Sequence, residues 1–201
     1  MERSISHNGK AWSNAKKDRI ELVAPDTTWA RQYKVEAVAL RSVIPLVRGL
    51  RIAHFGSTSI PGIRAKPIID IMLIHPEPAL WPDLIDVIAS LSYVYWAENP
   101  RKDRMFFVKG MPPFGLRRTH HLHVRVPNDA VAELSFRDLL RTDPATAREY
   151  ERVKQELSER YPNDRDAYTE GKAEYFAKVL GRSPPKPLMQ TTARAAADQE
   201  R

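Results

Sequence analysis

Two apolar strands joined by a short polar turn form the strongest hydrophobic pattern in the chain. Residues 51–74 read RIAHFGSTSIPGIRAKPIIDIMLI, and the pattern predicts strands over 51–55 and 67–74. Alternate side chains of a strand share a face. The second strand is apolar at almost every position, which is typical of a central strand covered on both faces. One acid, Asp70, lies inside it.

The remaining pattern alternates between helical and strand spacing. A helix is expected to begin at Asp26-Thr27-Thr28 and to end or bend near Pro45, because proline cannot continue the helical hydrogen bonds. We further expect a helix over 80–91, strands over 20–23, 93–96, 104–109 and 119–126, and three C-terminal helices, the last two beginning near 143 and 164. This order predicts an α+β or α/β domain with a helical C-terminal layer.

Length and composition fit one globular domain. The chain has 201 residues, 42% of them hydrophobic and 28% charged, and no cysteine, which excludes disulfides and thiolate chemistry. We assign the domain to residues 19–182 and expect disordered tails over 1–18 and 183–201. No apolar run reaches the roughly 20 residues of a membrane span. The first residues also have no apolar segment of the signal-peptide type, so the expected location is the cytoplasm.

The positive charge of the chain is concentrated at its two ends. The formal net charge is +7, and residues 1–18 and 182–201 carry +2 each, which leaves +3 for residues 19–181. Solvated ends account for this distribution better than a basic face that binds nucleic acid. Nucleic acid is therefore not the expected partner.

The turn between the two strands has the chemistry of a phosphate-binding loop. Gly56 permits close backbone approach, and Ser57, Thr58 and Ser59 supply hydroxyl donors. Lys66 follows after a short loop and can neutralise phosphate charge. Plain turns also contain Gly-Ser pairs, so the prediction of a nucleotide or phosphate site depends on the whole combination of turn, lysine and apolar strand.

Asp70 is the expected metal ligand. A carboxylate inside an apolar strand must be neutral, paired or metal-bound, because burying it alone is costly. A salt bridge to Lys66 or to a nearby arginine is the structural alternative. The preceding turn favours a functional role, in which Asp70 holds a divalent ion.

A cluster of histidines marks the strand THHLHVRV. Three of the chain's six histidines fall within four residues, and alternation places His121, His123 and Arg125 on one face. We expect His121 or His123 to line the same cleft as Asp70, where an imidazole can act in acid–base steps. A structural zinc site and plain hydrogen-bonded sheet histidines are the alternatives.

Several other polar residues are weaker candidates. Tyrosines and lysines of the last two helices would place hydroxyl and ammonium groups over a phosphate cleft, although helix packing explains the tyrosines equally well; they are Tyr150, Lys154, Tyr168 and Lys172. Arg104 and Lys109 flank an aromatic strand and could reach an anionic substrate.

Several unusual strings in one order make the chain similar to the GrpB family, a branch of the polymerase β-like nucleotidyltransferase superfamily. They are HFGSTSIPGIRAKPIIDI, HHLHV, FRDLLRTDPATAREYERVK and the pair Tyr168 and Lys172, and the resemblance extends from about residue 21 to 181. It implies a minimal nucleotidyltransferase fold of class α+β, which is a mixed β-sheet with helices packed mainly on one face.

The resemblance also implies roles for site residues. Gly56 and Ser57 match the turn that binds the triphosphate. Asp70 matches the first of two Mg²⁺-binding acids on the next strand, and Met72 occupies the position of the second. His123 occupies the position of a third acid, which lies on a later strand.

The implied activity is transfer of a nucleotidyl group from a nucleoside triphosphate to a small-molecule acceptor, with Mg²⁺ at Asp70 and with His121 or His123 helping to deprotonate the acceptor. A nucleotide- or phosphometabolite-binding module without transferase activity, and a structural partner of another enzyme, are the competing readings.

Overall fold

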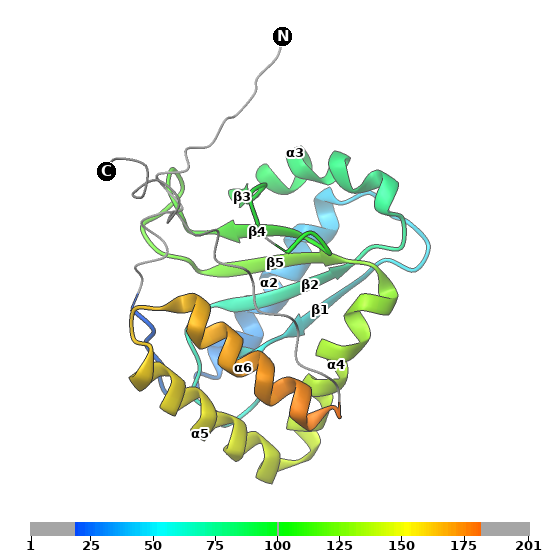
Figure 1. Ribbon diagram of the computed structural model, residues 1–201. Coiled ribbons are helices and arrows are strands. Elements are labelled where there is room, and N and C mark those ends of the chain that lie inside the picture. Colours follow the sequence, from blue (N-terminus) through cyan, green and yellow to red (C-terminus); the bar gives the residue numbers. More distant parts are fainter. Residues whose placement is uncertain (1–18, 100, 182–201) are drawn as a thin grey trace, which may run out of the picture.

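Five strands form one mixed sheet in the computed structural model, which describes residues 19–99 and 101–181 (Figure 1). The tails expected over 1–18 and 183–201 lie outside the described residues. The sheet order is β1-β2-β5-β4-β3. The strands are β1 (Arg51–Phe55), β2 (Ile69–Ile74), β3 (Tyr93–Tyr95), β4 (Met105–Lys109) and β5 (His120–Arg125). β2 and β5 run parallel, whereas the other neighbouring pairs are antiparallel.

Helices lie on both sides of this sheet, and the α+β class is confirmed. They are α2 (Thr28–Val43), α3 (Leu84–Ala89), α4 (Pro127–Thr142), α5 (Pro144–Arg160) and α6 (Arg165–Val179), with 3₁₀ turns η1 (Ser57–Ser59) and η2 (Pro78–Asp83). Figure 1 shows α2 behind the sheet, α3 near β3, and α5 and α6 side by side at the end of the molecule where β1 finishes. No helix in the described ranges has both the length and the apolar character needed to cross a bilayer.

Two expected elements differ from the structure. The strand expected over 20–23 is reduced to a single bridge between Val23 and Ala65. The first half of the helix expected over 80–91 is the 3₁₀ turn η2, which contains Pro82. Proline has no N–H to donate, so regular α-helix begins only after it, at Leu84.

The alternation along β2 sorts its side chains onto two apolar faces. Ile69, Ile71 and Leu73 are fully buried in the main core, which also contains residues of α2, α3 and β5. Met72 and Ile74 pack on the opposite side with Ala130 of α4. The prediction of a central strand covered on both faces is therefore confirmed.

A second apolar cluster fixes the loop after η1 beneath the C-terminal helices. Its buried members are Ile60, Ile63, Phe136, Leu140, Ala147, Tyr150 and Tyr175. The α4–α5 corner is set by Asp143, whose side chain accepts hydrogen bonds from the N–H groups of Ala145 and Thr146. The turn that follows β1 is thus held between the sheet edge and the helical layer.

Candidate nucleotide and metal site

The turn after β1 lies directly against Asp70. The antiparallel register pairs Phe55, the last residue of β1, with Asp70 of β2. Gly56 then adopts φ +67° and ψ −175°, a conformation that is essentially restricted to glycine. A Cβ at Gly56 would overlap the Asp70 Oδ2 atom. The glycine is therefore required by the carboxylate of the neighbouring strand, and the sequence had suggested only close approach to a ligand.

The hydroxyls of the turn have different surroundings. Thr58 is buried and its Oγ1 lies 3.1 Å from His54 Nε2 and donates to the Ile68 carbonyl at 3.3 Å. Ser59 is also buried and donates to the Gly56 carbonyl at 2.6 Å. Both hydroxyls thus stabilise the turn itself, and their phosphate-binding role stays a prediction. Ser57 is the one that faces the helical layer.

Ser57 interacts with Tyr150 of α5. Burial raises the pKa of the Tyr150 phenol to about 12, although the Ser57 side chain acts in the opposite direction. Helix α4 supports the turn from the side, because Arg141 donates to the Ser59 carbonyl and Arg137 to the His54 carbonyl, both at 2.9 Å. The turn is therefore held rigidly, as a binding loop needs to be.

Two histidines and Asp70 meet on the face of the sheet below this turn. The parallel register places Asp70 beside His121 and Met72 beside His123. The Asp70 Oδ1 atom lies 3.0 Å from His121 Nδ1. One ligand atom from each of Asp70, His121 and His123 lies within 4.8 Å of the other two. The structure thus brings both histidines next to Asp70, whereas the sequence analysis expected His121 or His123 there.

Aromatic rings enclose the two imidazoles. The His123 ring centre is 5.1 Å from that of Phe55 and 4.7 Å from that of Phe106, and Phe106 is 5.1 Å from His121. Burial lowers the pKa of His121 to about 4 and that of His123 well below its ordinary value. Both imidazoles are therefore neutral at neutral pH; because the ionised Asp70 carboxylate can only accept, His121 donates its Nδ1–H to it and keeps its lone pair on Nε2.

Asp70 remains ionised and accessible. Burial acts to raise its pKa, but the hydrogen bond from His121 and the nearby positive groups outweigh that effect and lower it to about 2. Its side chain is 28% exposed. A salt bridge between Asp70 and Lys66, the structural alternative, is not formed among the described residues, where Asp70 pairs with His121.

The side-chain amines of two lysines contact one aromatic ring near Asp70. The Nζ atoms of Lys66 and Lys172 are 5.2 Å and 4.5 Å from the centre of the Tyr168 ring. Within the described part of the chain, neither ammonium has a hydrogen bond or ion pair to a carboxylate. Burial lowers the pKa of Lys66 well below its ordinary value and that of Lys172 to about 8.

The surroundings of these lysines are strongly basic. Besides each other, their main charged neighbours are the acid Asp70 and three arginines, Arg165, Arg118 and Arg101. We missed Arg118 and Arg165 at the sequence level. Arg118 lies two residues before β5, at the end of the sheet where Asp70 also lies, but only the strand order reveals that proximity.

Three of the weaker candidates have structural contacts instead. Lys154 is buried, donates to the Arg64 carbonyl and lies over the Tyr150 ring, so it holds the loop after η1. Lys109 pairs with the buried carboxylate of Glu36 at 2.8 Å. Arg104 binds Asp103 through two nitrogens, at 3.0 and 2.8 Å. Lys172, Tyr168 and Tyr150 are the candidates from the helices that reach the site.

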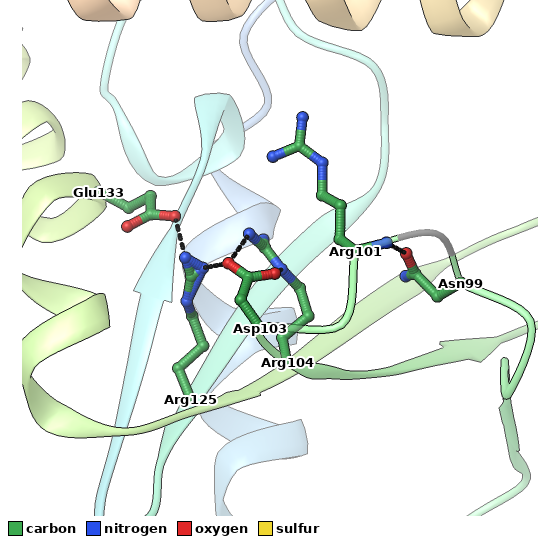
Figure 2. Close-up of polar contacts among 6 residues, drawn as sticks. All are labelled: Asn99, Arg101, Asp103, Arg104, Arg125 and Glu133. Carbon is green, nitrogen blue, oxygen red and sulfur yellow. Dashed lines mark hydrogen bonds and ion pairs between the residues drawn. The ribbon is translucent and has the colours of Figure 1, made fainter. Parts of the chain in front are cut away.

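A network of ion pairs anchors the loop before β4 (Figure 2). Arg125 of β5 contacts Asp103 at 3.2 Å and Glu133 of α4 at 2.9 Å. Figure 2 shows the Arg101 guanidinium directed away from this network, toward the helices. Arg101 is also one of the charged groups that lower the pKa of Lys172. The network therefore anchors the loop that carries Arg101, a further cation near Lys172.

The mixed five-stranded sheet with its helices defines an α+β protein, which is the fold class that the resemblance implied. The Gly-Ser turn follows its first strand, and Asp70 is on the next strand. Within this class the chain belongs to the GrpB family, whose model, described as GrpB protein, matches residues 19–182.

Individual relatives agree with this assignment. A UPF0157 protein of Pseudomonas aeruginosa is 50% identical over 176 residues, covering 88% of this chain and 72% of its own length. The glutamate-rich protein GrpB of Alkalihalophilus pseudofirmus is 32% identical over 168 residues, with 82% and 95% covered. The crystal structure of the conserved protein GrpB from Enterococcus faecalis is 29% identical with a TM-score of 0.65, covering 80% of this chain and 99% of that one.

Proposed function

We propose that the protein binds a nucleoside triphosphate above Asp70 and transfers its nucleotidyl group to a small-molecule acceptor. The observation that carries the proposal is the pair of amines of Lys66 and Lys172, which share one aromatic ring and form no ion pair with any acid of residues 19–99 and 101–181. Burial and the other amine both lower the pKa of each lysine, and a polyphosphate bound beside them would supply the negative charge that favours their protonated forms.

The turn and Asp70 would contact different parts of the bound nucleotide. The backbone at Gly56 lies against Asp70, so a phosphate group held by the turn would lie close to Asp70 and His121. Burial keeps the imidazoles of His121 and His123 neutral, which is the state that a proton acceptor or a metal ligand needs. The cytoplasm stays the predicted location.

Mg²⁺ is proposed to enter with the nucleotide and not to reside in the protein. The donors around Asp70 are one carboxylate and two imidazoles, whereas Mg²⁺ prefers oxygen ligands. Met72, at the position of a second acid, is fully buried among apolar side chains. A Mg²⁺ ion bound to phosphate oxygens would keep its preferred ligands.

The alternative function is nucleotide binding without transfer. The observation that favours it is again Met72, because the superfamily resemblance implies two acids and this chain has one. Both readings require the nucleotide to bind at the same place. Only the transferase reading requires pyrophosphate to be released.

Asp70→Asn is expected to reduce pyrophosphate release by about 100-fold or more while the protein stays folded, because the amide cannot supply the negative charge that orients an ion or His121. Pyrophosphate is measured with each of the four nucleoside triphosphates. Asp86→Asn on the exposed side of α3 is the control and should have no effect. Equal rates for the unaltered protein and Asp70→Asn would remove Asp70 from the mechanism.

Nucleotide affinity is expected to fall above about pH 8. Lys172 has its pKa lowered to about 8, so its ammonium is charged below that pH and neutral above it. Loss of the charged form weakens anion binding by up to about tenfold per pH unit. Titrations from neutral to alkaline pH measure the effect. Lys172→Arg should flatten the profile, since guanidinium stays charged; an unchanged slope would show that another group is responsible.

A further inference from the structure

Three side chains on two neighbouring strands have the arrangement of an open metal site. His121 and His123 are two residues apart on β5, and Asp70 lies beside His121 on β2. Their ligand atoms lie within 4.8 Å of one another. Three protein ligands leave coordination positions for water or substrate, as in catalytic and not in closed structural sites. The partly exposed Asp70 side chain, at 28%, gives an ion access.

The two imidazoles also have unused buried nitrogens. His121 Nε2 and His123 Nδ1 are inaccessible to solvent and have no hydrogen-bond partner in the described structure. A buried polar atom without a partner costs free energy, and the protein gains nothing from two of them in an apolar setting of Phe55 and Phe106. A cation bound to these two nitrogens would supply the partner that each of them lacks in the described structure.

We propose that Asp70, His121 and His123 bind one divalent first-row transition-metal ion, of the kind of Zn²⁺, Co²⁺ or Fe²⁺, in preference to Mg²⁺. Imidazole suits these ions, and two imidazoles with one carboxylate form a recognised donor set for them. Mg²⁺ demands oxygen ligands and gives up its water reluctantly, so this set disfavours it.

This inference deepens the proposed function, on which its catalytic meaning rests. With the ion bound, the imidazoles are ligands, and an acceptor hydroxyl would be activated by coordination to the ion. The nearby ammonium groups of Lys66 and Lys172 repel a cation. A polyphosphate bound to them would reduce that repulsion, so nucleotide and ion should each strengthen the binding of the other.

The test is a titration of the metal-stripped full chain with Co²⁺, followed by its visible ligand-field absorption. We expect one equivalent to bind, Zn²⁺ to displace it, and excess Mg²⁺ to leave the spectrum unchanged. His121→Gln and His123→Gln should each weaken Co²⁺ binding by at least about tenfold. His120→Gln is the matched control, because His120 is on the same strand but its Nδ1 faces Thr119.

Thermal melts establish that each variant is folded. In the unaltered protein, Zn²⁺ should shift the side-chain nitrogen NMR signals of two of the six histidines, which tests the site without any substitution. Absence of Co²⁺ binding, displacement of Co²⁺ by equimolar Mg²⁺, or equal weakening by His120→Gln would overturn the proposal.

Nucleotide binding is measured separately in the presence of chelator. Co²⁺ bound at His121 and His123 without any nucleotide binding would support the metal site and overturn the proposed function. Nucleotide binding without Co²⁺ binding at these residues would overturn the metal site and leave the proposed function standing. The two ideas therefore fail independently.

Discussion

Replacing Lys66 and Lys172 together by methionine is expected to weaken nucleoside triphosphate binding by about 100-fold or more. A hydrogen bond to a charged group contributes about 1.5–3 kcal/mol, and both ammonium groups would lose such contacts with the phosphates. Methionine keeps an unbranched chain that can still pack on Tyr168, so the fold should be little affected. Binding is measured by calorimetry with the full chain and with inorganic triphosphate as a second ligand.

Lys178→Met is the matched control for this double variant. Lys178 is exposed on α6, which is also the helix of Lys172, and it is the basic residue of the last turn of that helix. The control should bind nucleotides as the unaltered protein does. If the double variant binds triphosphate as tightly as Lys178→Met, the paired ammonium groups are not the phosphate site.

The second large effect is expected from Gly56→Ala. The backbone at Gly56 lies in a region that costs other residues about 1–3 kcal/mol, and the new methyl group would also overlap Asp70 Oδ2. We expect the free energy of unfolding to fall by about 2–4 kcal/mol. Displacement of the carboxylate should also abolish turnover. Urea unfolding and pyrophosphate release measure the two effects.

Gly62→Ala is the control that distinguishes backbone strain at a positive φ from steric overlap with Asp70. Gly62 also has a positive φ of +80°, but a Cβ there would meet nothing within 4 Å. Its substitution should cost about 1 kcal/mol and leave activity intact. Equal destabilisation by both substitutions, with turnover retained in Gly56→Ala, would contradict the contact between the turn and Asp70.

Periodicity predicted the five strands of the sheet and the faces of β2 and β5, but it also predicted a strand over 20–23 that is only a bridge. The apolar run of β2 predicted burial on both sides, and alternation along β5 grouped His121 with His123. Alternation says nothing about which strands pair. The contact between Asp70 and His121, 51 positions apart, depends on the parallel register of β2 and β5, which only the folded sheet defines.

The cations of the site could not be ranked from sequence for a similar reason. Lys66 and Lys172 meet because α6 crosses the end of the sheet, and both lie on the Tyr168 ring. Lys109 was a weaker candidate, as Lys172 was, yet it is neutralised by Glu36 of α2. Whether a lysine is available for a ligand depends on the acid that the fold places beside it.

The most direct test of the central claim is calorimetric titration of the full chain with ATP, GTP, CTP and UTP in the presence of Mg²⁺. The account predicts one binding site for at least one triphosphate, with affinity falling from triphosphate to diphosphate and no binding of the nucleoside, since the contacts are made to phosphates. A ligand that binds only the folded state should also raise the melting temperature. No heat and no thermal shift with any of the four nucleotides would contradict the claim.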